Sequence, residues 1–230
     1  MKNKILTILG TRPELIKMFP VIKKLDMNFD NKLVWSGQHY DFELVENIFK
    51  DVNCRKPDKI LMINKKKNNF FELQLKIFEI LEKLKPKAVI YHGDTFTTLA
   101  ASLVSNLFFP NIIRIHIEGG YRSKDNNQIE EKARKASDQL SNIIFTQRTE
   151  DRKSLFKENI KKNVHVVGNS IYDSIQTILK TSNKNKINKK FFFLNKKKFI
   201  FATIHRAENV ENTARFKKII DIINILSKEN

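Results

Sequence analysis

One stretch of the sequence combines acids, glycines and a cation in an order that could support acid–base chemistry. Glu118 comes shortly after an apolar run at residues 112–115 and precedes two glycines and Arg122, and the paired acids Glu130 and Glu131 open the next helical pattern. The apolar run is typical of a buried parallel strand, and open α/β sheets bind ligands at the carboxyl ends of their strands. The same residues also suit a helix-capping acid beside a glycine loop, so this stretch alone leaves both interpretations open.

Two further strand ends carry charged side chains that could belong to a site, and the cations at the first suit a phosphate-bearing ligand. Arg12 and Lys17 follow Gly10 at the predicted start of a helix, where backbone N–H groups already favour anions. A phosphate contact is therefore at least as well supported as two solvated charges. Asp94 follows an apolar strand at residues 88–91 and offers a second carboxylate, although helix capping is the simpler interpretation of this acid taken alone.

The elements that must position these residues alternate along the chain. Short apolar runs of strand type are separated by amphipathic helical patterns, and each connection is long enough for a crossover. The predicted strands cover residues 4–9, 32–35, 60–63, 88–91, 112–115, 143–146 and 164–167. This alternation predicts an α/β fold with a doubly wound, mostly parallel Rossmann-like sheet, whose glycine-bearing strand ends gather at one edge.

The organisation of the chain changes after residue 170. We expect residues 1–170 to form the first Rossmann-like domain and residues 171–198 to form a linker helix with a basic loop. Residues 199–230 contain an apolar strand pattern at 199–203 and then a helical pattern. One strand–helix unit cannot bury its own face, so these residues are interpreted as the incomplete start of a second Rossmann-like domain with exposed apolar side chains.

Composition excludes several classes of protein. The formal net charge is +18, but the lysines are dispersed or lie in Asn/Lys-rich loops that lack the patterns of nucleic-acid-binding motifs. The lone Cys54 excludes an intrachain disulfide framework and a thiolate metal cluster. No apolar run reaches the length of a membrane span, and the N-terminus lacks a secretory cleavage site. We therefore expect a cytoplasmic protein that binds neither nucleic acid nor membrane.

Six short motifs occur in an order that is typical of one family. They are Gly10-Thr11-Arg12-Pro13-Glu14, Gly37-Gln38-His39, His92-Gly93-Asp94-Thr95, Glu118-Gly119-Gly120-Tyr121-Arg122, Gly168-Asn169-Ser170 with Asp173, and His205-Arg206-Ala207-Glu208-Asn209. Together they resemble the UDP-N-acetylglucosamine 2-epimerases of the non-hydrolysing type, over nearly the whole chain. The resemblance implies two Rossmann-like domains in the glycosyltransferase-B arrangement, with the active site in the cleft between them.

The resemblance also implies a reaction and a substrate. Such enzymes interconvert UDP-GlcNAc and UDP-ManNAc for surface polysaccharide precursors, without a metal or a nicotinamide cofactor. The C2 proton is lost with anti elimination of UDP, and UDP adds back to the 2-acetamidoglucal after reprotonation on the other face. This chemistry requires acid–base groups on both faces of the sugar and cations for the departing diphosphate. Enclosure in the cleft would raise the pKa of a carboxylate that acts as an acid.

The motifs match the family residue by residue. The matched acid–base residues are Asp94, Glu118, Glu130 and His205, and the matched substrate-binding residues are Arg12, Lys17, Gln38, His39, Arg122 and Arg206. The resemblance places Arg12 and Lys17 beside the phosphates and implies that Arg122 orients either the acid–base group or the ligand. It implies that His205 is contributed by the second domain.

The chain departs from the family pattern at several positions. Gly119-Gly120-Tyr121 stands where Ala-Gly-Leu is more common, Ile129 replaces a proline, and Ala133 replaces an asparagine. These changes bear on which sugar is bound, so a modified UDP-HexNAc is an alternative substrate. The serine–glycine-rich motif that holds uridine diphosphate in the family has no counterpart before Asn230.

The absence of this motif determines what we expect of the chain's activity and partners. We expect an N-terminal portion of such an enzyme, with little activity alone, that forms a homodimer or pairs with a complementing C-terminal chain. Two alternatives remain open at this point. One is the hydrolysing relative, which releases UDP and free ManNAc, and the other is a non-catalytic binding domain.

Overall fold

The chain divides into two compact units, Met1–Lys180 and Thr181–Asn230. The computed structural model describes residues 2–37, 47, 49–61, 63, 70–123, 125, 128–181, 199–204 and 207–228. Among these residues the first unit contains the strands and most of the helices, and it holds all the contacts from which the candidate site is built.

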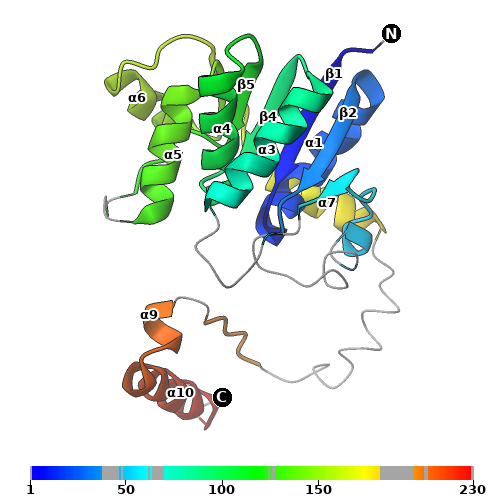
Figure 1. Ribbon diagram of the computed structural model, residues 1–230. Coiled ribbons are helices and arrows are strands. Elements are labelled where there is room, and N and C mark those ends of the chain that lie inside the picture. The colour runs from blue at the N-terminus through cyan, green and yellow to red at the C-terminus, as the bar shows by residue number, and fades with distance from the viewer. Residues whose placement is uncertain are drawn as a thin grey trace. The chain divides into compact units, whose positions relative to one another are not determined.

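The first unit is organised around one parallel sheet. Its strands are β1 (Lys4–Leu9), β2 (Asp30–Trp35), β3 (Lys59–Ile60), β4 (Ala88–His92), β5 (Ile113–Ile117), β6 (Ile143–Thr146) and β7 (Val164–Val166). They are hydrogen-bonded in the order β3-β2-β1-β4-β5-β6-β7, and each neighbouring pair is parallel (Figure 1). The predicted α/β fold with a doubly wound parallel sheet is confirmed, and each strand predicted in this unit overlaps an observed one.

Helices cover both faces of this sheet. They are α1 (Arg12–Asn28), α3 (Phe70–Leu84), α4 (Phe96–Phe108), α5 (Ile129–Leu140), α6 (Thr149–Lys157) and α7 (Ile171–Thr181). Alternate side chains of β1 belong to two separate cores: Ile5 and Leu9 pack with α1, whereas Leu6 and Ile8 pack with α3 and α4. Because the neighbouring strands are all parallel, the loops that follow them lie at the same edge of the sheet.

The start of α1 shows how local sequence positions one of these loops. Thr11 precedes the helix in an extended conformation, and Pro13 occupies the first turn, where its missing N–H has no partner to lose. The Glu14 carboxylate accepts the Thr11 N–H at 2.6 Å, which is one half of a capping box. The loop between β1 and α1 is therefore short and tightly held.

The second unit contains described helices but no described strand. Its helices are α9 (Ala207–Val210) and α10 (Thr213–Lys228). The prediction of a strand at residues 199–203 is wrong, because residues 199–204 have no strand pairing. A β-strand needs a hydrogen-bonded neighbour, and residues 199–204 and 207–228 of this unit supply no second strand. The predicted exposure of apolar side chains is confirmed, with Phe201 85% exposed and Ile222 56% exposed.

Two further searches cover the part of the chain that the structure describes. None of its helices combines the length and the apolar content that a membrane crossing requires. No group of three or more His, Cys, Asp or Glu side chains within the same residues is arranged to hold a metal ion.

Candidate active site

Three of the predicted site residues lie at the same edge of the sheet. Arg12 follows β1, Asp94 follows β4 and Glu118 follows β5, and these three strands are parallel and adjacent. The strand order reverses between β1 and β4, and open α/β sheets bind their ligands at such a switch point. The prediction that these residues share one sheet edge is confirmed.

Glu118 has an unusual backbone conformation. Its φ of 68° lies in the left-handed region, which is unfavourable for a residue with a side chain by about 1–2 kcal/mol. The N–H groups of Glu118 and Gly119 both donate to the carbonyl oxygen of Phe145 on β6, at 3.0 and 3.2 Å. These hydrogen bonds hold the strained turn and fix the direction in which the Glu118 side chain leaves β5.

Two basic side chains flank the Glu118 carboxylate. Lys17 Nζ donates to Oε1 at 2.5 Å, and His92 Nε2 lies 3.1 Å from Oε2. The His92 ring is buried, and its nitrogens form no well-aligned hydrogen bond with the described residues. The His92 contact is therefore one of close electrostatic proximity, while the Lys17 contact is a direct ion pair.

These neighbours keep Glu118 ionised. Burial raises the pKa of the Glu118 carboxyl group, but His92 and Lys17 outweigh burial and lower this pKa to about 2. Within the first unit the pKa of Glu118 is therefore lowered, and the effect expected of a cleft between two domains stays a prediction. Glu118 is therefore ionised at neutral pH and has no proton to donate.

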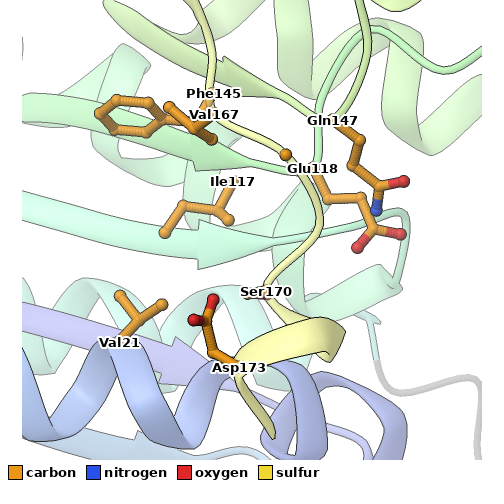
Figure 2. A pocket seen from close by; sticks show the side chains of 9 residues that line it. Val21, Ile117, Glu118, Phe145, Gln147, Val167, Ser170 and Asp173 are labelled. Atoms are coloured by element: carbon orange, nitrogen blue, oxygen red, sulfur yellow. The ribbon is translucent and has the colours of Figure 1, made fainter. Parts of the chain in front are cut away.

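A pocket of about 260 Å³ opens beside Glu118 (Figure 2). Its apolar wall comes from Val21, Ile117, Phe145 and Val167, and its polar lining comes from Glu118, Gln147, Ser170 and Asp173. These residues belong to α1, to the ends of β5 and β6, and to the segment that leads from β7 into α7. The pocket lies wholly within the first unit.

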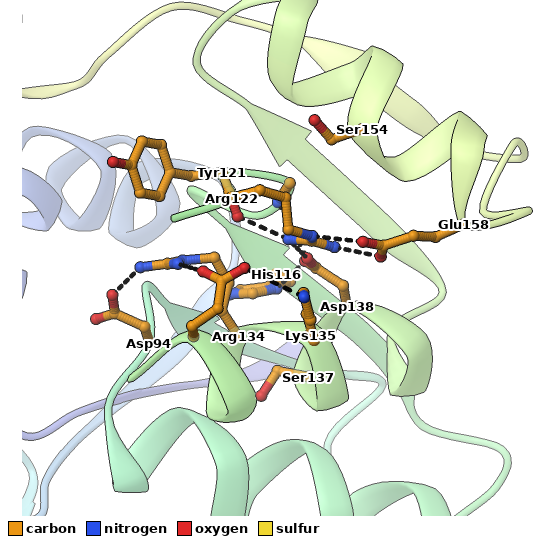
Figure 3. Close-up of polar contacts among 12 residues, drawn as sticks. Asp94, His116, Tyr121, Arg122, Arg134, Lys135, Ser137, Asp138, Ser154 and Glu158 are labelled. Atoms are coloured by element: carbon orange, nitrogen blue, oxygen red, sulfur yellow. Dashed lines mark hydrogen bonds and ion pairs between the residues drawn. The ribbon is translucent and has the colours of Figure 1, made fainter. Parts of the chain in front are cut away.

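Arg134 joins Asp94 to the paired acids of α5. Its guanidinium donates to Asp94 (Figure 3) and, at 2.6 Å, to Glu131. Glu131 is buried and also accepts the Ser123 N–H at 3.1 Å. Glu130 is exposed in the first turn of α5 and forms no hydrogen bond with the described residues. The structure therefore brings the second acid of the pair, Glu131, into the network around Asp94 and leaves Glu130 outside it.

A buried chain of charges supports the two loops that carry Asp94 and Glu118 (Figure 3). His116 Nδ1 lies 2.8 Å from Asp138 Oδ1, and Nε2 lies 2.7 Å from the carbonyl oxygen of Gly93. Because a carbonyl can only accept, Nε2 carries the proton in that hydrogen bond. Arg122 donates to Asp138 at 2.8 Å and to both carboxylate oxygens of Glu158 at 2.7 and 2.6 Å. Burial raises the pKa of Asp138, but His116 and Arg122 outweigh burial and lower it.

These contacts bear on the role of Arg122. Its N–H groups donate to the Tyr121 carbonyl oxygen at 2.7 Å as well as to Asp138 and Glu158. Arg122 is therefore engaged in holding the loop that follows Glu118. Of the two roles that the family resemblance allows, the contacts favour orienting the acid–base loop over binding the ligand.

Glu14 is a site residue that the sequence interpretation did not single out. Its buried carboxylate accepts the Gly10 N–H at 2.7 Å, the Thr11 N–H at 2.6 Å and the Thr95 hydroxyl at 2.8 Å. It therefore ties the loop after β1 to the loop after β4. Burial raises the pKa of Glu14. The spacing Thr-x-x-Glu at the start of α1 was the available signal.

Comparison with known proteins identifies the family. Residues 23–230 match the family model described as UDP-N-acetylglucosamine 2-epimerase. The chain belongs to the UDP-N-acetylglucosamine 2-epimerase family.

Relatives of this epimerase-family chain are longer than it is. Over 225 residues the chain is 38% identical to a UDP-N-acetylglucosamine 2-epimerase homolog of Methanococcus maripaludis. The aligned region covers 95% of this chain and 61% of the relative. The crystal structure of the Methanocaldococcus jannaschii UDP-GlcNAc 2-epimerase in complex with UDP-GlcNAc and UDP is 34% identical, with a TM-score of 0.88 over 98% of this chain and 63% of that one. The Neisseria meningitidis UDP-GlcNAc 2-epimerase bound to UDP-GlcNAc is 33% identical, with a TM-score of 0.80. The match covers 90% of this chain and 58% of that one. The chain spans about three fifths of the length of these relatives.

The structure brings together only part of the residues expected of an epimerase. Arg12, Lys17, Asp94 and Glu118 meet at one sheet edge, whereas Gln38, His39, His205 and Arg206 lie outside the described residues. His92 and Arg134 contact the predicted acids directly, although neither was among the site residues predicted from the sequence. Their positions, at the end of β4 and one turn after the paired acids of α5, were the available signals.

Proposed function

We propose that this chain provides the sugar- and diphosphate-binding half of an active site that converts UDP-GlcNAc into UDP-ManNAc. The observation that carries the proposal is the Lys17–Glu118–His92 cluster, in which an ionised carboxylate lies between two basic side chains at the switch point of the sheet. The solved structures of two relatives, which contain UDP-GlcNAc, support the choice of ligand.

In the proposed reaction Glu118 removes the proton from C2 of the sugar. The electron pair of the C2–H bond forms the C1–C2 double bond, and the C1–O bond breaks with its electrons leaving on UDP. Re-addition of UDP to C1, with protonation of C2 on the other face, completes the epimerisation. Arg12 and Lys17 would stabilise the charge that develops on the diphosphate, an effect for which one well-placed donor is typically worth about 100-fold or more in rate.

The Lys17–Glu118 ion pair gives this reaction a way to activate its base. A carboxylate with a pKa of about 2 is a weak base as long as Lys17 stays bound to it. A diphosphate competes for the same ammonium group, because it carries more negative charge than one carboxylate. Substrate binding would therefore draw Lys17 away from Glu118. The basicity of the Glu118 carboxylate would then rise when the substrate is in place.

The other matched residues take their roles from the resemblance. Asp94, held by Arg134, is proposed as an acid–base group of the opposite face, with Glu130 and His205 as further candidates. Gln38, His39 and Arg206 are proposed to bind substrate, and Arg122 to orient the Glu118 loop. No metal or nicotinamide takes part in this proposal.

One incubation separates the alternatives. Purified protein is mixed with UDP-GlcNAc, and the products are resolved by anion-exchange chromatography and proton NMR. UDP-ManNAc supports the proposal, UDP with free ManNAc points to the hydrolysing relative, and retention of UDP-GlcNAc with measurable binding points to a binding domain. Repeating the assay with modified UDP-HexNAc sugars tests the alternative substrates.

The length of the relatives leads to a further proposal about activity and partners. The 230 residues correspond to 61% of the Methanococcus maripaludis relative, so they present only part of the groups that such a protein has available. We propose that the chain alone turns over slowly and that a complementing C-terminal chain restores activity, within a homodimer or a heteromeric assembly. A cytoplasmic location and a role in surface polysaccharide precursors belong to the same proposal. Co-purification with such a chain, followed by light scattering and assay, tests the assembly.

A further inference from the structure

Tyr121 is an exposed aromatic residue in the loop that follows β5, and the proposed reaction gives it no role. The guanidinium carbon of Arg134 lies over its ring, 4.9 Å from the ring centre. An arginine within about 6 Å of a ring centre is attracted by the negative face of the ring. The loop that carries Glu118 therefore makes direct contact with the helix that carries Arg134.

Arg134 contacts different partners through its edge and its face. The edge of its guanidinium donates to Asp94 and, at 2.6 Å, to Glu131. In Figure 3 the guanidinium lies between the Tyr121 ring and the Asp94 carboxylate. A guanidinium is planar, so it can donate hydrogen bonds within its plane and still stack an aromatic ring on its face. The hydrogen bonds fix the direction of the group, and the ring fixes its plane.

Burial strengthens both kinds of contact. The Arg134 side chain is only 9% exposed, whereas that of Asp94 is 33% exposed. A cation–π contact becomes stronger when the cation is removed from water, and an ion pair becomes stronger when water is kept away from it. Without the Tyr121 ring, water would reach the face of the guanidinium and compete with Asp94 for its N–H groups.

A second arginine contacts the same ring more weakly. The guanidinium carbon of Arg148 lies 5.8 Å from the ring centre, and the Arg148 side chain is 57% exposed. Arg148 also donates to Asp151 at 2.9 Å, in an ion pair at the start of α6. An exposed cation gains little from an aromatic face, because water already hydrates it. The buried Arg134 is therefore the main partner of Tyr121.

We propose that Tyr121 is a positioning residue, which holds the guanidinium of Arg134 in the plane that orients Asp94. Asp94 and Glu118 follow the neighbouring strands β4 and β5, and the contact between Tyr121 and Arg134 joins the two loops. The two carboxylates therefore keep a fixed relation to each other when a ligand binds. This inference rests on the proposed function, in which Asp94 and Glu118 act on opposite faces of the sugar.

The first test measures the guanidinium itself and needs no turnover. The full chain is labelled with ¹⁵N-arginine, the Arg134 signals are assigned from the variant Arg134→Lys, and rotation about the Cζ–Nε bond is measured by NMR. Tyr121→Leu should speed this rotation about tenfold, the size expected when a buried arginine loses a cation–π contact. Tyr121→Phe should keep the slow rotation, because it keeps the ring.

A matched control removes a different ring. In Phe156→Leu the lost ring also has an arginine over it, Arg152 at 5.7 Å, on α6. This variant should leave the rotation of Arg134 unchanged. Circular dichroism melting verifies that each variant is folded.

The second test measures catalysis in the chain assembled with a complementing C-terminal chain. Initial rates of UDP-ManNAc formation are recorded over a range of UDP-GlcNAc concentrations. Tyr121→Leu should lower kcat about tenfold and leave KM nearly unchanged, because Asp94 acts in the chemical step. The expected loss is part of the roughly 100-fold that a misplacement of 1 Å can cost. Tyr121→Phe should restore kcat.

Each contrary result has its own meaning. An unchanged rotation in Tyr121→Leu would overturn the positioning role and leave the proposed function standing. An equal increase in Tyr121→Phe or in Phe156→Leu would overturn it too, because the aromatic face over Arg134 would not be the cause. Faster rotation with an unchanged kcat would show that the plane of Arg134 does not serve the reaction. Absence of UDP-ManNAc from the unmodified assembly would refute the proposed function, and with it the catalytic role of Tyr121, whatever the rotation rates.

Discussion

At Glu118, backbone strain and charge act on the same side chain. The left-handed φ of 68° aims the carboxylate between Lys17 and His92, and those two neighbours lower its pKa to about 2. Strained backbone at a non-glycine residue persists only where the surroundings hold it, and it is concentrated at functional sites. The coincidence of strain with two basic contacts is why Glu118 is the leading candidate for the base.

Replacing Lys17 tests the electrostatic part of this argument. In Lys17→Met the pKa of Glu118 should rise from about 2 towards its ordinary value near 4.5, because burial then meets less opposition. A lowered folded-state pKa stabilises the protein above the unfolded-state pKa, and this stability is lost as the pH falls towards 2. The free energy of unfolding of Lys17→Met should therefore fall less in acid than that of the unmodified chain. Side-chain ¹³C NMR titration measures the shift. Lys24→Met, an exposed lysine on the same helix, is the control, and an unchanged pKa in Lys17→Met would assign the effect to His92 alone.

Replacing Glu118 tests whether its carboxylate acts as the base. When the chain is co-expressed with a complementing C-terminal chain, Glu118→Gln should reduce exchange of the C2 proton with solvent deuterium by about 100-fold or more, the usual contribution of a general base. Mass spectrometry of recovered UDP-HexNAc measures the exchange. Glu150→Gln, an exposed acid of α6, should exchange normally. Undiminished exchange in Glu118→Gln would remove this residue from the mechanism.

At the scale of elements, the sequence was informative where structure is local. Apolar runs such as 4–9 and 143–146 were found because a strand buried on both faces is apolar throughout. The strand predicted at 199–203 failed because pairing depends on a neighbour that no local pattern reveals. The contact between Arg134 and Asp94 joins residues 40 positions apart, so spacing alone could not predict it.

Two glycines in the site loops make a matched pair for testing the turns. Gly93 and Gly120 have φ values of 73° and 83°, but a Cβ on Gly93 would meet nothing within 4 Å, whereas one on Gly120 would lie 2.8 Å from the Asp151 carbonyl oxygen. Gly93→Ala should lower the free energy of unfolding by about 1–2 kcal/mol, for the left-handed conformation alone. Gly120→Ala should lower the free energy of unfolding by about 1–3 kcal/mol more than Gly93→Ala, because the backbone around Asp151 must move. Urea unfolding followed by Trp35 fluorescence measures both, and equal losses would contradict the packing around Gly120.

Asp138 links α5 to the loops after β4 and β5, and its charge should be visible in the pH dependence of stability. Because the folded-state pKa of Asp138 is lowered, its contribution is complete above the ordinary Asp value of about 4 and declines as the pH falls below it. Asp138→Asn should lower the free energy of unfolding by about 3–5 kcal/mol at neutral pH, as expected when one partner of a buried ion pair is removed. The loss should shrink in acid. Melting temperatures between about pH 3 and 7 test this, and a pH-independent difference would show that charge is not the cause.

For the molecule as a whole, the second unit presents apolar side chains to solvent. On α10, Ile222 and Ile225 are 56% and 57% exposed. Burying apolar surface is favourable by about 25 cal/mol per Å², so association of this unit with another chain or another copy is expected. The double variant Ile222→Asp/Ile225→Asp should lower the mass measured by light scattering at high protein concentration. Leu107→Asp on α4 is the control, and a wild-type monomer at all concentrations would refute the expectation.

The hydrogen bonds of Arg122, Asp138 and His116 are all completed inside the first unit. Among the described residues these side chains already have their partners, so ligand binding need not pull them into a new arrangement. Immobilising a flexible side chain during association costs about 0.5–1.5 kcal/mol, and these side chains have already lost that freedom. The first unit should therefore act as a rigid template, on which a bound ligand finds these side chains already in place.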